Sequence, residues 1–190
     1  MSKYYSIPPQ LYDDQFWWKK DDIEFWKSIC HNNKNKKILE IACGTGRIAL
    51  PLIKAGVHYT GIDLSHEYVD YAKQKILPYN KCSLIKQNDM RNFNHHIKYD
   101  VIFIGFNSFL HLLKEEDALQ CLKSILKHMH KNSYLYIDIF VPHPLFLNRP
   151  ENHQAHVIEF FDSSIKETAK IKETIIPIHI YNFSFYIIYY

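Results

Sequence analysis

The sequence predicts an α/β fold: a doubly wound, mostly parallel sheet followed by antiparallel strands at its C-terminal end. Short, β-branched apolar runs alternate with segments whose apolar residues recur at helical spacing, which is typical of a parallel sheet with helices on both faces. The first apolar run ends in a glycine turn, ACGTG, and the second ends at an acid, in GIDLS. In such sheets ligands bind at the carboxyl ends of the strands, so we expect the functional site there.

The first half of the chain contains two strand–helix repeats. After a polar, aromatic leader, Asp21 and Asp22 can cap a helix in which apolar residues follow at helical spacing. ILEIA is a buried strand, and GRIALPLIKAG is a helix that Pro51 should shorten or kink. HYTGID is the second strand, and Ser65 caps the helix that follows it.

The second half continues the pattern and then departs from it. CSLIKQ and YDVIFIGF are the third and fourth strands, and SYLYIDIF is the fifth. Between the last two we expect a helix from about Glu115 to Met129, with acids in its first turn. Its stripe of Leu119, Leu122, Leu126 and Met129 is interpreted as core. The remaining segment predicts two or three strands, broken at Pro177.

The length and composition favour a single domain over residues 1–190, since 190 residues with 47% apolar side chains suffice for one sizeable core. The formal charge of +3 comes from dispersed lysines, which argues against nucleic acid as a partner. No apolar run reaches the roughly 20 residues of a membrane span. The four cysteines form no C-x-x-C pair, which favours a cytoplasmic protein with reduced thiols. The twelve histidines reproduce no zinc spacing, so we expect no required metal.

The glycine turn has the spacing of a nucleoside-binding loop. Gly44, Gly46 and Ala49 fit G-x-G-x-x-A, and Asp63 follows near the interval of about 20 residues expected of a ribose-binding acid. This pattern alone fits a nicotinamide dinucleotide as well, or simply a tight turn in an α/β fold. Glycine at such a turn lets the backbone approach a ligand closely, because no Cβ intervenes.

Three further features favour a different nucleoside. Glu40 lies inside the first strand, where a buried carboxylate is costly unless it is paired, and it would suit a cationic, amine-bearing ligand. NDM follows the third strand and offers a carboxylate for an adenine amine, with a methionine to pack on the ring. Asn107 and Ser108 follow the fourth strand and place polar side chains at the carboxyl edge.

The motifs LEIACGTGRIALPL, GIDLS, NDMRNF and FNSFLHLL, in this order, resemble the class I S-adenosylmethionine-dependent methyltransferases, in particular the small-molecule branch. The resemblance covers roughly Tyr12 to Pro144 and implies a Rossmann-like methyltransferase fold. It divides the chain into a helical leader or lid (1–35), a cofactor-binding core (36–144) and an antiparallel, substrate-side extension (145–190). S-adenosyl-L-methionine is the implied cofactor and S-adenosyl-L-homocysteine its product.

The resemblance also implies which residues hold the cofactor. Gly44 and Gly46 would lie under its methionine part, Asp63 would take the ribose hydroxyls, and Asp89 with Met90 would hold the adenine edge. Arg47 and Arg91 each follow a cofactor motif, so either could meet the cofactor carboxylate or form a salt bridge. The full set of expected cofactor-binding residues is Glu40, Ala42, Cys43, Gly44, Gly46, Arg47, Asp63, Leu64, Asn88, Asp89, Met90 and Phe106.

Two residues are candidates for a part in catalysis. His111 matches a position where some relatives use a histidine to orient or deprotonate an acceptor amine, and its ordinary pKa of about 6.5 suits that role. A lone histidine in SFLHLL also fits a hydrogen-bonded structural residue. Tyr12 matches a leader tyrosine that closes over the cofactor, with Trp17 and Trp18 as walls of an acceptor pocket. An aromatic leader can also simply cover the sheet.

The function implied is methyl transfer to nitrogen or oxygen of a small molecule. Relatives continue past the fifth strand to a closing antiparallel hairpin, whereas this sequence stops at FYIIYY. We therefore expect a second copy to pair with the terminal strand, giving a homodimer. The alternative is a C-terminally truncated protein that binds or cleaves the cofactor without methylating an acceptor. A nicotinamide-dependent oxidoreductase is disfavoured by Glu40 and NDM.

Overall fold

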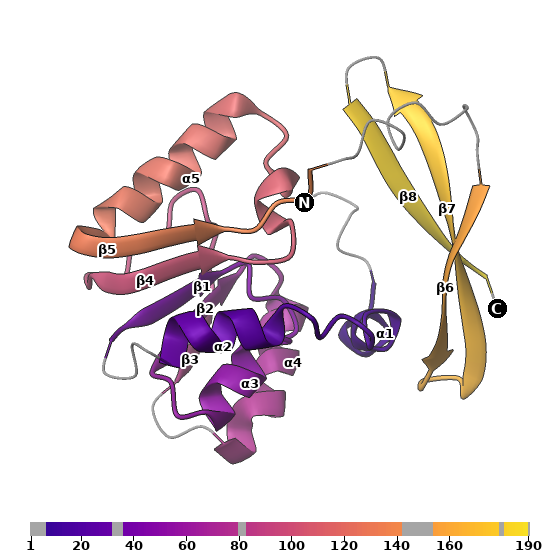
Figure 1. Ribbon diagram of the computed structural model, residues 1–190, viewed down its shortest axis with the longest axis horizontal. Helices are drawn as coiled ribbons and strands as arrows, with labels where there is room; N and C mark the ends of the chain where they lie inside the picture. Colours follow the sequence, from indigo (N-terminus) through magenta and orange to yellow (C-terminus); the bar gives the residue numbers. More distant parts are fainter. Residues whose placement is uncertain (1–6, 32–35, 80–82, 142–153, 179–180, 190) are drawn as a thin grey trace. The chain divides into compact units, whose positions relative to one another are not determined.

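The computed structural model describes residues 7–31, 36–79, 83–141, 154–178 and 181–189 (Figure 1). Its contacts divide the chain into two compact units. The first unit comprises Met1–Pro9 and Lys20–Ile139, and the second comprises Gln10–Lys19 and Phe140–Tyr190. The expectation of a single domain stays a prediction.

The first unit is built on a five-stranded, all-parallel sheet, which confirms the doubly wound α/β prediction. The strand order is β3-β2-β1-β4-β5, so the order reverses between β1 and β4. The strands are β1 (Ile38–Ile41), β2 (Tyr59–Asp63), β3 (Leu84–Gln87), β4 (Tyr99–Ile104) and β5 (Met129–Ile137).

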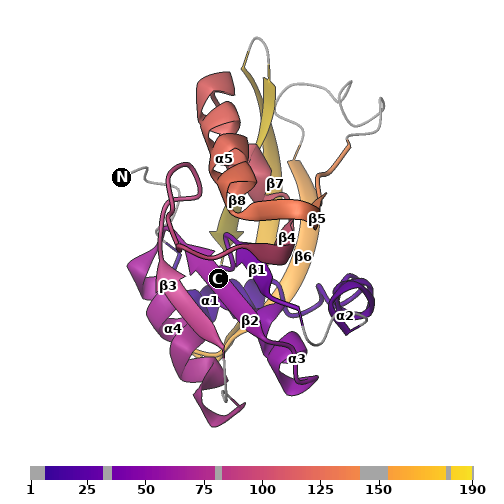
Figure 2. The same cartoon turned by 90° about the vertical axis from the view of Figure 1, so that its left-hand side faces the viewer.

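Helices cover both faces of this sheet (Figures 1 and 2). On one face lie α2 (Ile23–His31), α3 (Ala49–Lys54) and α4 (His66–Ile76); on the other lies α5 (Glu115–Lys127). The short 3-10 helices are η2 (Leu77–Tyr79) and η3 (Ser108–His111). Trp26 of α2 is buried and stacks on Phe103 of β4 with ring centroids 4.5 Å apart, so α2 is part of the core.

Two helix boundaries follow from local chemistry. The predicted cap of α4 is confirmed, because the Ser65 side chain accepts a hydrogen bond from the backbone N–H of Tyr68. The helix α3 begins only at Ala49, three residues after the last glycine of the turn. Pro51 then falls in its first turn, where a missing N–H is tolerated, so the proline shortens the helix rather than kinking it.

The expected leucine stripe of α5 is confirmed for Leu122 and Met129, which pack against the core, and is wrong for Leu119 and Leu126. Leu119 is 46% exposed and Leu126 is 65% exposed, and Met129 belongs to β5 rather than to the helix. The buried side chains that face the sheet from α5 are Cys121 and Ile125, one turn apart, with Leu122 partly buried beside them. Apolar residues occur on more than one side of this helix, and their spacing does not show which side meets the sheet.

The second unit contains a three-stranded antiparallel sheet in the order β6-β7-β8. Its strands are β6 (Gln154–Asp162), β7 (Glu167–Ile178) and β8 (Tyr181–Tyr189). The predicted break at Pro177 is wrong, because β7 continues through Pro177 to Ile178. There β7 pairs only with β8, since its pairing with β6 extends no further than Thr174, so a residue without an N–H is tolerated.

The helix α1 (Pro9–Gln15) belongs with this second sheet. Leu11 packs against the buried cluster of Phe160, Ala169 and Ile171. The Asp14 carboxylate accepts hydrogen bonds from the backbone N–H and the hydroxyl of Ser163, at 2.9 and 2.6 Å. These contacts attach the N-terminal helix to the turn between β6 and β7. Among the described residues, no helix is long and apolar enough to cross a membrane.

Candidate cofactor site

The turn between β1 and α3 has an unusual backbone. Ala42, Gly44 and Gly46 all have positive φ angles, of 57°, 55° and 77°. Glycine tolerates this conformation, whereas at Ala42 it is strained, and such strain is found preferentially at ligand sites. A Cβ added to Gly44 would meet nothing within 4 Å, so there is open space beside the turn. The Cys43 N–H donates to the Ile62 carbonyl at 2.9 Å, which holds the turn against β2.

The carboxylate of Asp63, at the end of β2, is bound to this turn. It accepts the backbone N–H of Gly44 at 2.8 Å and that of Ser65 at 2.9 Å. Its side chain is only 7% exposed. Burial raises the pKa of Asp63, while the two N–H groups and the charge of His111 oppose that rise. Each carboxylate oxygen keeps acceptor capacity for a further donor, such as a ribose hydroxyl.

Glu40 is buried beneath the turn and has a partner that the sequence analysis missed. The Tyr59 hydroxyl donates a hydrogen bond to its carboxylate, and Glu40 is only 3% exposed. Burial raises the pKa of Glu40 to about 8, although Tyr59 and the charge of Arg47 lower it. The expected role of Glu40 toward a cationic ligand stays a prediction.

This raised pKa predicts a pH-dependent stability. Between about pH 4.5 and 8 the unfolded carboxyl is ionised while the folded one keeps its proton, so the free energy of unfolding falls as pH rises. The slope from this group is about 1.4 kcal/mol per pH unit, and it vanishes below and above that window. Urea unfolding of the wild type and of Glu40→Gln from pH 5 to 8 measures it. We expect the Gln variant to lose several kcal/mol less over this range; equal slopes would contradict the assignment.

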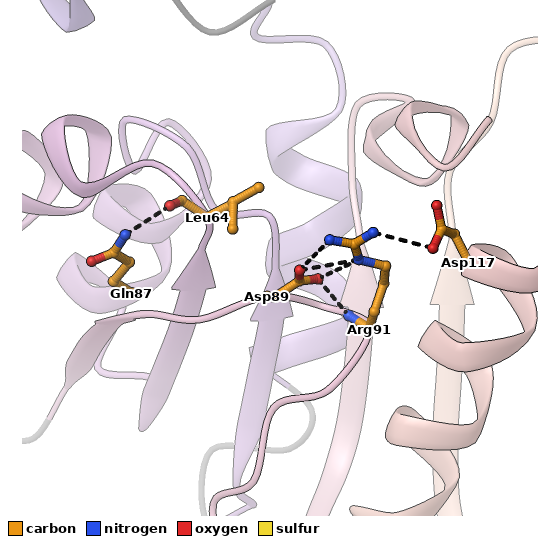
Figure 3. Close-up of polar contacts among 5 residues, drawn as sticks. All are labelled: Leu64, Gln87, Asp89, Arg91 and Asp117. Atoms are coloured by element: carbon orange, nitrogen blue, oxygen red, sulfur yellow. Dashed lines mark hydrogen bonds and ion pairs between the residues drawn. The ribbon is translucent and has the colours of Figure 1, made fainter. Parts of the chain in front are cut away.

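The segment after β3 comes next to Asp63 through its backbone, because the Asn88 N–H donates to the Asp63 carbonyl at 2.9 Å. Asp89 is held by Arg91, whose Nε lies 3.0 Å from both carboxylate oxygens and whose Nη2 lies 2.6 Å from one of them (Figure 3). The Nη1 of Arg91 also donates to Asp117 of α5 at 3.1 Å. Arg91 thus takes the salt-bridge alternative, and it lowers the pKa of Asp89.

The two other expected adenine contacts flank this segment. Leu64 is 47% exposed, and its carbonyl accepts a hydrogen bond from Gln87 Nε2 at 3.0 Å (Figure 3). Met90 is partly buried against the core on the α5 face of the sheet. The exposed Leu64 side chain is therefore available to pack on an adenine ring. The Met90 side chain is already partly packed against the core.

Arg47 also forms a salt bridge. Its guanidinium donates to both carboxylate oxygens of Asp22, at 2.7 and 2.8 Å, and its Cζ lies 5.0 Å from the ring centroid of Phe106. It therefore connects the start of α2, the glycine turn and the segment after β4. The backbone of that last segment is strained, since Phe106 and Asn107 have φ angles of 51° and 61°. The Phe106 N–H donates to the Asp138 carboxylate at 3.0 Å.

The two expected catalytic residues belong to different units. His111 ends η3 in the first unit and keeps part of its surface exposed; the protein around the rest of it desolvates the ring and lowers its pKa, and the nearby charge of Asp63 opposes this. Tyr12 lies on α1 in the second unit, with its ring 4.7 Å from that of Phe16. Trp17 and Trp18 are exposed in the same unit. The roles of all four stay predictions.

The structure adds four residues that sequence reasoning did not place at the site: Asp22, Tyr59, Asp117 and Asp138. Each one holds a predicted site residue through a contact distant in sequence. Of these, Asp138 could have been noticed in the sequence, because it is an acid in the mostly apolar run SYLYIDIF. Among the described residues, no three metal-ligating side chains gather into a metal site, and the absence of a required metal stays a prediction.

The residues present fit an adenosine-containing cofactor. A buried carboxylate with spare acceptor capacity is hydrogen-bonded to a glycine turn, and open space lies beside that turn. Both stand at the carboxyl edge of the sheet next to the reversal of strand order. This arrangement defines a Rossmann-like nucleoside-binding domain.

Comparison with known proteins identifies the family. Residues 38–132, half of the chain, match the family described as "Methyltransferase domain", and the chain belongs to this family. It is 33% identical over 104 residues to YqeM of Bacillus subtilis (strain 168), which carries a methyltransferase name. That match covers 54% of this chain but only 42% of YqeM, so the chain spans less than half the length of this relative.

Solved structures support the same assignment of fold. The sugar N-methyltransferase KedS8 from Streptoalloteichus sp ATCC 53650 has a TM-score of 0.68 at 17% identity, covering 100% of this chain and 81% of KedS8. CalS10, an amino pentose methyltransferase from Micromonospora echinaspora solved with bound S-adenosylmethionine, has a TM-score of 0.66 at 12% identity, covering 90% and 77%. The fold is therefore that of the class I S-adenosylmethionine-dependent methyltransferases, whose cofactor is S-adenosylmethionine.

Proposed function

We propose that this chain transfers a methyl group from S-adenosylmethionine to nitrogen or oxygen of a small molecule. The observation that carries the proposal is the Asp63 carboxylate bound to the N–H of Gly44 beside open space. The family assignment supports the reaction. KedS8, a sugar N-methyltransferase, and CalS10, an amino pentose methyltransferase, favour an amine or amino-sugar acceptor. The alternative is a protein that binds or cleaves the cofactor without methylating an acceptor.

Different residues of the first unit would contact different parts of the cofactor. Asp63 would accept the ribose hydroxyls, and Leu64 would pack on the adenine. Gly44 and Gly46, with Ala42 and Cys43, would lie under the methionine part, facing the backbone at Phe106. Asn88, Asp89 and Met90 would border the adenine, with Arg91 holding the Asp89 carboxylate in one orientation.

In methyl transfer the main task of the protein is to position the acceptor against the methyl group of the cofactor. When bound, S-adenosylmethionine supplies a methyl group on a sulfonium, which an electron pair of the acceptor displaces in line. The chain must hold the acceptor in that line and exclude water. A protonated amine must first lose a proton, and His111, with a pKa lowered by desolvation, is suited to accept it at neutral pH. We propose that Tyr12 closes over the bound cofactor.

The test is calorimetric titration with S-adenosylmethionine, S-adenosylhomocysteine and NAD, followed by an assay for S-adenosylhomocysteine release with amino sugars, simple amines and alcohols. We expect both sulfur nucleosides to bind and NAD not to bind, with turnover that depends on the acceptor. Release of product at the same rate without any acceptor would support cofactor cleavage instead. Binding of NAD alone would overturn the proposal.

Arg47 and Asp22 are expected to position the glycine turn rather than to bind the cofactor directly. Asp22→Asn keeps the size of the side chain but removes one of two charge-assisted contacts, so we expect a loss of about 1–2 kcal/mol in stability. Affinity for S-adenosylhomocysteine should fall less than threefold. Arg47→Lys, which loses the planar fork, should behave alike. If Arg47→Lys lost most of its affinity while Asp22→Asn did not, Arg47 would instead contact the cofactor.

We further propose a cytoplasmic homodimer assembled through the C-terminal strands. Among the described residues, β8 pairs with β7 along one edge and no strand pairs along its other edge. Unpaired edges of this kind recruit a further strand. Light scattering during size-exclusion chromatography should give twice the monomer mass of 22.7 kDa; a monomer at micromolar concentration would contradict the proposal.

A further inference from the structure

We propose that the first unit carries a second binding site, for a small phosphate-bearing molecule, in a hollow between residues 91–98 and the C-terminal half of α5. The hollow has a volume of about 650 Å³, within the range of small-ligand sites. Its walls come from the loop that connects β3 to β4 and from α5. The glycine turn and Asp63 do not line it; Arg91, which holds Asp89, lies where this hollow borders the candidate cofactor site.

The residues that line the hollow carry a net positive charge, which favours binding of an anion. Arg91, Lys98, Lys123 and Lys127 line the hollow and no carboxylate does. Arg91 is already neutralised by Asp89 and Asp117 (Figure 3), so the three lysines supply the uncompensated charge. Within the described part of the chain, no acid pairs with any of these lysines. The carboxyl end of α5 adds only about half a negative charge, which three lysines outweigh.

The three lysines are exposed, and the backbone places them along two facing walls of the hollow. Lys123 and Lys127 are one helical turn apart on α5. Lys98 approaches from the opposite wall and donates through Nζ to the Lys127 carbonyl at 2.6 Å. Three like charges that line one hollow raise its positive potential, which favours binding of an anion.

The floor of the hollow is formed by buried, hydrogen-bonded groups. The His128 ring is 4% exposed and stacks on Phe93 with centroids 4.3 Å apart. Its Nδ1 lies 2.7 Å from the Ser124 carbonyl, and its Nε2 accepts the His95 N–H at 3.1 Å. Because Nε2 accepts, the ring is neutral with its proton on Nδ1, so His128 shapes the site without adding charge.

Amide side chains complete the recognition. Asn92, Asn94 and Gln120 also line the hollow and offer side-chain N–H donors. Lysine ammonium groups with neutral donors are a common combination for phosphate oxygens. The volume of the hollow favours one molecule carrying one or two phosphates. The dispersed lysines elsewhere do not extend it into a track for nucleic acid.

The experiment is calorimetric titration of the full chain with pyrophosphate at constant ionic strength, with sulfate as the reference anion. The test variant is Lys123→Gln/Lys127→Gln. The matched control is Lys73→Gln/Lys131→Gln, which removes the same charge from α4 and β5, outside the hollow. We expect 1:1 binding of pyrophosphate, weakened at least tenfold in the test variant and less than twofold in the control.

Further measurements distinguish failure of this proposal from failure of the proposed function. Asp63→Ala should keep its affinity for pyrophosphate even where it loses S-adenosylhomocysteine. Loss of pyrophosphate binding in Asp63→Ala, with retention in the lysine test variant, would place the phosphate at the glycine turn and overturn the inference. Equal affinities of the two lysine variants, or pyrophosphate heats no larger than those of sulfate, would also overturn it.

Discussion

Replacing Asp63 with alanine is expected to weaken binding of S-adenosylmethionine and S-adenosylhomocysteine by about 100-fold or more. A carboxylate that accepts two ribose hydroxyls makes two charge-assisted hydrogen bonds, each contributing roughly 1.5–3 kcal/mol. Losing both removes about 3 kcal/mol, which is more than a factor of 100 in affinity. The variant also leaves the Gly44 N–H without its carboxylate partner, so the glycine turn itself should loosen.

Calorimetry measures the affinity, and circular dichroism shows whether the variant is folded. Asp63→Asn serves as the conservative variant, because an amide can accept from only one of the Gly44 and Ser65 N–H groups. The matched control is Asp70→Ala, which removes an acid on the outer face of α4 and should leave affinity unchanged. Full affinity in a folded Asp63→Ala protein would show that the ribose lies elsewhere.

The second large effect is expected at Gly61, in the middle of β2. A Cβ at this position would lie 2.7 Å from the Tyr59 hydroxyl oxygen and 2.9 Å from the Cys43 sulfur. Both neighbours are buried, and overpacking of a core costs about 1–3 kcal/mol. Displacing Tyr59 also disturbs its hydrogen bond to buried Glu40, which adds about 1–3 kcal/mol. We expect Gly61→Ala to lower the free energy of unfolding by about 3 kcal/mol or more.

Gly56→Ala provides the matched control for this substitution. Gly56 has a φ of 83° and open space where its Cβ would be, so alanine there meets only backbone strain of about 1–2 kcal/mol. Urea unfolding of both variants at one pH measures the difference. If Gly61→Ala is no less stable than Gly56→Ala, the close packing around Tyr59 does not persist in solution.

The parts of the fold that sequence reasoning predicted well are those governed by local chemistry. The strand ILEI and the capping Ser65 follow from β-branched residues and from a hydroxyl placed before a helix. Similarly, the positive φ angles of Gly44 and Gly46 match the residue type expected at a tight turn. Short-range rules of this kind need no knowledge of distant segments.

The sequence-based predictions were wrong where contacts with distant segments determine the structure. The exposed Leu119 and Leu126 show that helical spacing does not indicate which side of α5 meets the sheet. Pro177 is accommodated in β7 because only one strand pairs with that part of β7, and pairing depends on the other strands. In each case the local sequence pattern was read correctly, but contacts with distant segments determined the structure.

The sequence by itself determined the parallel α/β architecture, the glycine turn and the placing of Asp63 at the carboxyl edge, because periodicity, turn residues and spacing are properties of the chain alone. Only the tertiary structure decided the partners: Asp22 for Arg47, Tyr59 for Glu40, and Asp117 beside Arg91. Ion pairs and buried hydrogen bonds depend on which side chains folding brings within about 3 Å, and sequence separation carries no information about that distance.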